Sequence, residues 1–327
     1  MGEMGRQPAP EDFGAGDDIV TVFQLEGRPV RGRVVRLGAT ADAILAAHDY
    51  PVSVARLVGE AAMIATLIGD SLKFDGKLIV QASGPGSQGR QVEGEGAVAF
   101  VVADFAPGEG VRGYAKYDAE RVRMLEQVNG GPVGAQMLLG GGHFAMTVDP
   151  GPDMERYQGV TPIEGESLAD AAEFYFKQSE QVPSRLKLAV GRQMVAGGGH
   201  VWRAGGALIQ RIAGDETRGD AQADFDHGRA LFDTIDADEL IDPNITSGRL
   251  LFRLFHEEGV RVEESRPVPR RCACEQARLA RLLARFPSDD REHMSDDTGR
   301  VAMTCEYCNF EWRFSAEEID QAGKAND

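Results

Sequence analysis

Cysteine is scarce in this chain. Only four of its 327 residues are cysteines, and none precedes residue 272. So few cysteines exclude a fold that depends on a framework of disulfides. Basic residues are also few, 35 against 52 acids, which gives a formal net charge of −17. Such an acidic surface repels phosphate groups, so neither nucleic acid nor an anionic membrane is expected as a partner.

Long apolar stretches are missing as well. Residues 1–18 are polar and rich in Gly, Pro and acids, and Arg6 stands where an N-myristoylation motif requires Ser or Thr. No apolar run approaches the roughly 18–20 residues that a membrane helix needs. We therefore expect a disordered tail over residues 1–18 and a cytoplasmic protein.

The chain nevertheless has enough apolar residues for a sizeable core. They make up 42% of it, and the length suits two domains joined by a linker. Residues 19–214 alternate between strand and helix patterns separated by Gly- and Pro-rich turns. These patterns predict an α+β domain of twisted sheets around buried helices. Strands are expected at 20–25, 31–37, 72–82, 97–104, 111–117, 143–148, 185–190 and 206–212.

Three helices are expected in this domain. Thr40 is the predicted N-cap of a helix that runs to Asp49. Residues 52–69 are apolar on nearly every face, which is typical of a helix buried between sheets. Ser167 and Asp170 form a variant of the capping box and begin a helix through Phe176. Of the aromatic residues 174–176, at least two are expected in the core.

Residues 215–242 contain ten acids but only two arginines and few apolar residues. The segment is either a metastable helical linker or an ordinary solvated helix, and its composition does not decide between them. We assign residues 215–245 as an acidic helical linker and residues 246–327 as a small C-terminal domain. In that domain we expect helices at 247–257 and 275–286, a hairpin of 300–304 with 310–314, and a last helix that Ser315 and Glu318 cap.

The four cysteines carry the chemistry of the C-terminal domain. Cys272 and Cys274 form a CxC, and Cys305 and Cys308 form a CxxC after a gap of 30 residues. Two close pairs around a small insert are typical of a four-thiolate zinc site, with one Zn²⁺ per chain. Four protein ligands complete a tetrahedron and leave no position for a reactive water, which argues against hydrolytic chemistry.

The spacing leaves three interpretations of this site open: an inert zinc clip, a redox switch and a dithiol oxidoreductase. A switch is chemically reasonable, because zinc holds the sulfurs as thiolates, the form that oxidants attack. Zinc binding also supplies roughly 10–16 kcal/mol of folding free energy, so losing the metal would unfold so small a domain.

The chain resembles the heat-shock-protein-33 family of bacterial redox-regulated chaperones over about residues 17–320. The segments that carry the resemblance are 70–76 (DSLKFDG), 157–160 (YQGV), 175–181 (YFKQSEQ), 254–258 (LFHEE) and the CxC…CxxC pattern. Glu275-Gln276-Ala277 departs from the family's usual Ser-Arg-Glu after the CxC, so the next helix is expected to begin differently.

The resemblance implies an ATP-independent holdase, not an enzyme. In the family, oxidation pairs neighbouring cysteines, here Cys272–Cys274 and Cys305–Cys308, and releases zinc. The zinc domain then unfolds, the linker loosens and apolar surface is exposed to unfolding client proteins. The active form often dimerises, and clients pass later to an ATP-dependent foldase.

Two other functions compete with the holdase. One is a thiol–disulfide oxidoreductase that uses the CxxC pair, and the other is a zinc-ribbon assembly module. The Gly-rich stretch 82–89 is interpreted as a hairpin turn, since it lacks the Lys-Ser/Thr of a phosphate-binding loop. The six histidines show no ligand spacing, and only His293 lies in the cysteine insert.

Overall fold

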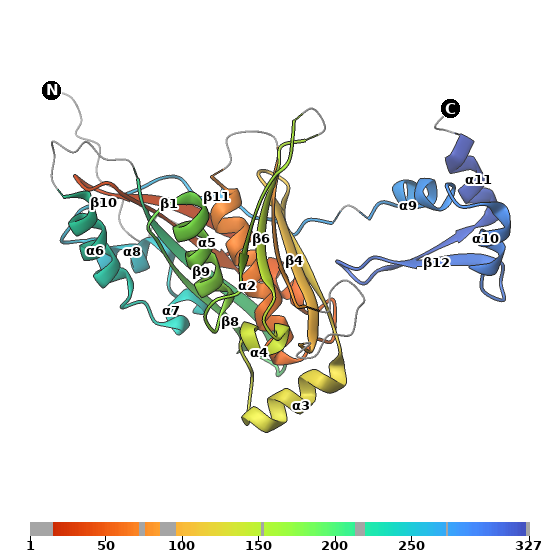
Figure 1. Ribbon diagram of the computed structural model, residues 1–327, viewed down its shortest axis with the longest axis horizontal. Coiled ribbons are helices and arrows are strands. Elements are labelled where there is room, and N and C mark those ends of the chain that lie inside the picture. Colours follow the sequence, from red (N-terminus) through yellow and green to blue (C-terminus); the bar gives the residue numbers. More distant parts are fainter. Residues whose placement is uncertain are drawn as a thin grey trace. The chain divides into compact units, whose positions relative to one another are not determined.

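The computed structural model of the chain describes residues 16–71, 76–85, 96–151, 154–212, 220–272 and 274–324. Its contacts divide the chain into two compact units, one ending at Arg270 and the other beginning at Arg271 (Figure 1). The predicted α+β class is confirmed, with two antiparallel sheets in unit 1. The finer division into tail, core, linker and zinc domain concerns independent folding and stays a prediction.

The first sheet of unit 1, sheet A, has the order β10-β1-β2-β9-β8, with β11 also paired to β1. Its strands are β1 (Ile19–Leu25), β2 (Val30–Leu37), β8 (Ser184–Met194), β9 (His200–Arg211), β10 (Val260–Val262) and β11 (Arg266–Pro267). Strands β8 and β9 are much longer than expected. The sequence obscured β9 because Gly205 and Gly206 interrupt it, yet both glycines allow close packing: a Cβ on Gly206 would lie 2.9 Å from Leu188.

The second sheet, sheet B, has the order β5-β4-β3-β6-β7. Its strands are β3 (Lys77–Ser83), β4 (Val98–Ala106), β5 (Gly110–Tyr117), β6 (His143–Asp149) and β7 (Tyr157–Pro162). Strand β7 and the short helices α3 (Ala119–Asn129) and α4 (Ala135–Leu139) were not predicted. The Gly-rich stretch predicted as a turn lies partly outside the described residues.

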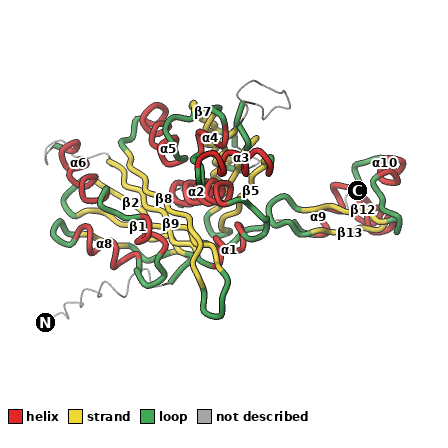
Figure 2. Tube along the Cα trace, turned by 90° about the horizontal axis from the view of Figure 1, so that it is seen from below, coloured by secondary structure: helices red, strands yellow, loops and turns green. Residues whose placement is uncertain are grey.

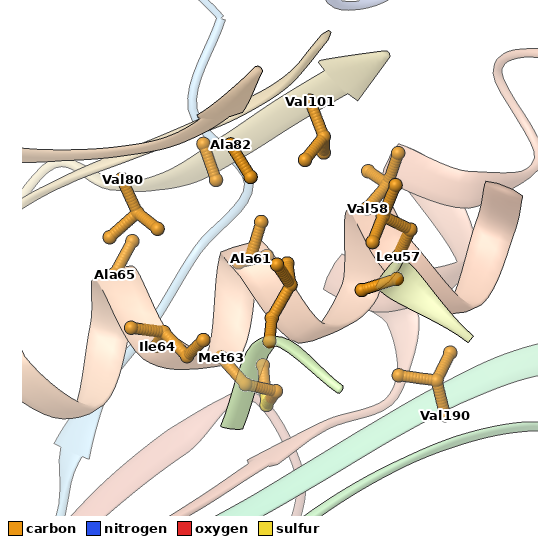
Figure 3. Close-up of a cluster of buried hydrophobic side chains, with 14 of the residues drawn as sticks. Leu57, Val58, Ala61, Met63, Ile64, Ala65, Val80, Ala82, Val101 and Val190 are labelled. Atoms are coloured by element: carbon orange, nitrogen blue, oxygen red, sulfur yellow. The ribbon is translucent and has the colours of Figure 1, made fainter. Parts of the chain in front are cut away.

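Helix α2 (Val52–Gly69) lies between the two sheets, as predicted. In Figure 3, Ala61 and Ala65 face Ala82 and Val80 of sheet B, while Val190 of sheet A lies on the other side of the helix. By length and composition this helix could cross a membrane, contrary to the expectation from the sequence. However, 78% of its apolar window is buried inside unit 1, so its hydrophobicity is that of a core helix.

The predicted cap of helix α1 (Ala39–Leu45) is wrong. Thr40 lies inside the first turn and donates from Oγ1 to the carbonyl of Val268, 3.0 Å away. Asp18 provides the cap instead, since its Oδ1 accepts from the backbone N–H groups of Gly38 (3.0 Å) and Thr40 (2.9 Å). Asp18 was assigned to the disordered tail, of which residues 1–15 lie outside the described part of the chain.

Helix α5 (Leu168–Tyr175) has the predicted capping box of Ser167 and Asp170. It continues into a π-helical turn at Phe176–Glu180. Tyr175 and Phe176 are buried, which confirms the prediction that two of the three aromatic residues belong to the core. Tyr175 packs directly on Gly159 of β7, where a Cβ would lie 2.3 Å from the tyrosine oxygen. The YQGV and YFKQSEQ segments therefore contact each other.

The acidic segment and the predicted helix that follows it lie on the outer face of sheet A. Helices α6 (Ala221–Phe232), α7 (Ala237–Ile241) and α8 (Ser247–Phe255) contact strands of that sheet. Figure 2 labels α6 and α8, and Figure 1 labels α7. Their few apolar residues are spaced to face the sheet and are buried there. This outer core contains Phe23, Leu25, Val30, Val34, Ala189, Ala207, Ile209, Phe225, Phe232, Ile235, Leu240, Leu250, Leu251, Leu254 and Phe255.

Acids of these helices and of the turn after α8 pair with arginines of sheet A and of its β1–β2 turn. Arg28 binds Asp224 of α6 at 2.7 Å and Glu258 at 2.6 Å. Arg185 of β8 binds Asp233, at the end of α6, at 2.6 Å. From residue 220 onward the segment is thus docked on the sheet rather than solvated on all sides, and its metastability stays a prediction.

Replacing Phe255 by alanine should weaken the attachment of α8. Phe255 is fully buried and stacks on Phe23 with ring centroids 5.6 Å apart. The loss of such a side chain costs about 3–5 kcal/mol, which urea unfolding followed by circular dichroism would measure. Phe252→Ala on the same helix is the control, because Phe252 is 50% exposed and should cost about 0.5 kcal/mol or less. Equal effects of the two changes would contradict this packing.

Unit 2 has a small core of its own. The elements of unit 2 are α9 (Gln276–Leu283), α10 (Ser288–His293), the hairpin of β12 (Arg300–Thr304) and β13 (Glu311–Ser315), and α11 (Ala316–Lys324). The predicted capping pair is present: the Ser315 N–H donates to Glu318 at 2.8 Å, and the Glu318 N–H donates to Ser315 Oγ at 3.3 Å. Among its described residues, those buried in this core are Ala280, Leu283, Val301, Phe314 and Ile319. So few buried residues leave such a unit dependent on another source of stability.

Candidate metal centre

The CxxC pair lies at the turn of the β12–β13 hairpin, as predicted. The Cys305 N–H donates to the carbonyl of Phe310 at 3.0 Å, and the Asn309 N–H donates to the carbonyl of Cys305 at 2.8 Å. Asn309 adopts a left-handed backbone with φ of 56°, which asparagine tolerates better than most residues. This tight turn places the sulfurs of Cys305 and Cys308 on one side.

The CxC pair lies just before α9, in a segment without regular structure. Its sulfurs meet those of the hairpin. The Sγ–Sγ distances are 2.9 Å for Cys272–Cys274, 3.9 Å for Cys272–Cys305 and 3.4 Å for Cys274–Cys308. Glu275 is the N-cap of α9 and makes no side-chain cap, in agreement with the departure noted in the sequence.

The cluster has the dimensions of a tetrahedral thiolate site. All four sulfurs lie within 4.8 Å of one another, and all four cysteines are free. A tetrahedron with metal–sulfur bonds of about 2.3 Å has sulfur–sulfur edges of about 3.8 Å. The separations here range from 2.9 Å for Cys272–Cys274 to at most 4.8 Å, a range that includes this edge length. The four cysteines can therefore hold one metal ion. His293 does not belong to the cluster; its Nδ1 lies 2.6 Å from the Asp289 carbonyl.

Burial and mutual hydrogen bonds set the acidity of three of these thiols. Burial raises the pKa of the Cys274 thiol, and its contact with Cys272 raises it further. Burial also raises the pKa of Cys308. Burial disfavours the thiolate of Cys272 as well. Hydrogen bonds, above all with Cys274, outweigh the effect of burial, so the pKa of the Cys272 thiol is lowered. A bound cation would favour the thiolate of every ligand, since that is the form that coordinates a metal.

Trp312 of β13 provides a polar group beside the cluster. Its indole Nε1 is buried. The same N–H group favours the thiolate of Cys274 and so opposes the rise in its pKa. Sequence reasoning missed Trp312, because residue spacing identifies ligands but not the donors that support them.

Comparison with known proteins agrees with this architecture. The family model described as "Hsp33 protein" matches residues 18–315. The 33 kDa chaperonin of Caulobacter vibrioides is 50% identical over 298 residues, which cover 91% of this chain and 95% of the relative. The 33 kDa chaperonin of Shewanella loihica is 33% identical over 304 residues, covering 93% and 94%.

A solved structure shows the same fold. The crystal structure of the 33 kDa chaperonin from Thermotoga maritima matches with a TM-score of 0.75 at 21% identity, and the match covers 94% of this chain and 99% of that one. With the family model and the Caulobacter relative, the assignment is settled by most of the chain rather than by the cysteines alone. The chain belongs to the Hsp33 family and is a redox-regulated holdase chaperone with a C-terminal four-cysteine cluster, not an enzyme.

Proposed function

We propose that the reduced protein binds one Zn²⁺ through Cys272, Cys274, Cys305 and Cys308, and that oxidation of these ligands activates it. The observation that supports this most directly is the cluster of four free sulfurs within 4.8 Å. Zinc suits the site because it accepts four thiolates in a tetrahedron and does not itself change oxidation state. When bound, it would hold all four sulfurs as thiolates.

Oxidation would join the sulfurs into the disulfides Cys272–Cys274 and Cys305–Cys308. Each bond forms as two thiolates lose two electrons to a peroxide-class oxidant, whose O–O bond breaks and which takes two protons from solvent to give water. The 2.9 Å between the sulfurs of Cys272 and Cys274 favours the first bond. The 3.4 Å between Cys274 and Cys308 would also allow a crossed pairing, so the neighbour pairing rests on the family resemblance. A disulfide has no thiolate left to coordinate the metal.

Loss of the metal should unfold unit 2 and then loosen α6–α8. Unit 2 buries few residues, so removal of roughly 10–16 kcal/mol of binding energy exceeds its margin of stability. The chain that enters unit 2 is itself part of unit 1: the buried Val268 donates its N–H to the Asp18 carbonyl at 2.7 Å, four residues before Cys272. Disorder that spreads backward from Cys272 would free first β11 and β10, and then α8.

The surface uncovered by this release is the outer core of sheet A. Its buried aliphatic and aromatic residues suit the apolar segments that an unfolding client exposes. Binding of this kind requires no ATP, and the acidic remainder of the chain keeps the complex in solution. We further propose a cytoplasmic location, dimerisation of the oxidised form, and transfer of clients to an ATP-dependent foldase.

Hydrogen exchange should show where the protein opens. After peroxide treatment we expect amides of α6–α8 and of unit 2 to lose protection. The amides of α2 and of strands β3–β6 should keep it, because the main core around them has few contacts with the segment after residue 214. Protection that is unchanged by oxidation in every element would contradict the proposed opening.

The alternative role as a thiol–disulfide oxidoreductase has little structural support. In such enzymes the nucleophilic cysteine gains acidity from the N-terminus of a helix. Here both cysteines of the CxxC lie in a hairpin turn, and their sulfurs face a second pair. An insulin-reduction assay should therefore give no activity above the uncatalysed rate, while the same oxidised sample suppresses aggregation of a heat-unfolded client.

A further inference from the structure

We propose that the surface under α7 is a client-binding subsite, in which Arg36 and Arg203 bind backbone carbonyls of an unfolded chain. We call this surface the α7 seat and define it by Arg36 of β2, Gly191 of β8, and Arg203 and Gly205 of β9. The inference rests on the redox release of α6–α8 proposed above and names part of the surface that the release uncovers.

Two buried arginines hold α7 in the seat by its main chain. The guanidinium of Arg36, only 1% exposed, donates to the carbonyl of Glu239 at 3.0 Å and to that of Asp242. Arg203 donates from Nε to the carbonyl of Ile241 at 2.6 Å. These carbonyls lie at the C-terminal end of α7, where the helix itself provides no donors.

The seat is shaped for a backbone rather than for a side chain. A Cβ on Gly205 would lie 2.1 Å from the carbonyl oxygen of Leu240, so the main chain of α7 lies directly on the strand. A Cβ on Gly191 would lie 2.9 Å from the end of the Ile241 side chain. Beside this flat floor, the Leu240 side chain is buried in the outer core with Ala189 and Ala207.

The empty seat would retain donors without acceptors. Both hydrogen bonds of the Arg36 guanidinium end on α7 or on its C-cap residue, Asp242. Arg203 would keep its two contacts with Asp17, at 2.7 and 2.5 Å, but would lose the acceptor of Nε. Water would hydrate these donors in the empty seat, and a client that covers the seat must supply carbonyls in place of that water, because burying the donors without partners would cost free energy.

This chemistry selects unfolded chains and is indifferent to their sequence. Every polypeptide has backbone carbonyls, but in folded proteins nearly all of them are already paired. An unfolded segment presents free carbonyls next to apolar side chains. Helix α7 presents the same combination to the seat, with the buried side chain of Leu240 and the carbonyls of Glu239, Ile241 and Asp242. The occupant that fits the α7 seat is therefore an apolar segment of an unfolded client.

Binding of an unfolded probe by the oxidised full-length chain tests the proposal. The probe is fluorescein-labelled α-lactalbumin that has been reduced and carboxymethylated, followed by fluorescence anisotropy. Arg36→Met and Arg203→Met remove the donors and keep an apolar stem. Each should raise the Kd for the probe by about tenfold, since hydrogen bonds to charged groups are among the stronger ones.

Arg192→Met is the matched control. Arg192 belongs to β8 but stacks on Trp202, whose side chain packs into the core on the other face of sheet A. The Kd of the Arg192→Met variant for the probe should equal that of the unsubstituted chain. Tight probe binding by the chain and by both seat variants would overturn the α7 seat and leave the redox proposal intact. Absence of probe binding by the oxidised unsubstituted chain would overturn both.

A cross-linking measurement tests the same proposal without the arginine variants, so its result does not depend on whether they fold. A benzophenone-labelled version of the same probe is irradiated with the oxidised unsubstituted chain, and the cross-linked peptides are mapped. Cross-links to β8 and β9 around residues 191 and 205 support the proposal. Cross-links confined to other elements overturn it, whether or not the arginine variants fold.

Discussion

Cys272→Ser and Cys308→Ser should each lower the zinc content of the reduced protein from about one ion per chain to near zero. Each change removes one of four sulfurs that lie within 4.8 Å of one another, and a hydroxyl is a poor ligand for zinc at neutral pH. Metal analysis after dialysis would measure the content. The chain has no other cysteine that could replace the lost ligand.

Loss of the metal should also be visible as loss of structure. If unit 2 gains roughly 10–16 kcal/mol from zinc in addition to its small core, as proposed, its amides should lose exchange protection in both variants. Thr304→Ser is the control, since Thr304 precedes Cys305 and ends strand β12 without joining the cluster. Undiminished zinc in both cysteine variants would reject the four-thiolate assignment.

Deleting residues 215–327 should give a folded fragment with holdase activity that no longer responds to oxidants. The main core around α2 is built almost entirely from residues before 215; among its buried members only Val268 would be lost. The outer core, in contrast, would lose α6, α7 and α8, which leaves Phe23, Val34 and Ile209 uncovered. No cysteine remains in the fragment to sense an oxidant.

The measurement is suppression of aggregation of a heat-unfolded client, with dithiothreitol or with peroxide. The fragment should act equally in both conditions, whereas the full-length chain should act only after oxidation. A folded fragment that is inactive in both conditions would mean that α6–α8 themselves bind clients. That result would reject the covering role of these helices but not the zinc switch, because the cysteine variants test the switch separately.

The sequence alone identified the features that depend on neighbours in the chain. The CxC and CxxC spacings predicted the cluster, because close cysteine pairs bring their sulfurs to one side whatever surrounds them. The capping pairs Ser167–Asp170 and Ser315–Glu318 were found for the same reason, since each spans three residues. The uniform hydrophobicity of residues 52–69 predicted a buried helix, because no other environment in a folded protein suits it.

Tertiary structure decided what depends on residues far apart in the chain. Thr40 is a reasonable cap by its own sequence, but the side chain of Asp18, 22 residues earlier, accepts from the backbone N–H of Thr40 itself. By sequence, the glycines of β9 indicate a break in the strand. In the structure the strand continues through them, and the main chain of α7, some 35 residues later, packs directly on Gly205.

The acidic segment shows the difference most clearly. Its composition left open whether it is a metastable linker or a solvated helix, because several partners of its acids and carbonyls lie outside the segment. Arg28 lies 196 residues from Asp224, and Arg36 lies 203 residues from Glu239. Composition measures the charge of a segment but not the distance to its counter-charges, and only the folded sheet brings these arginines to the helices that they hold.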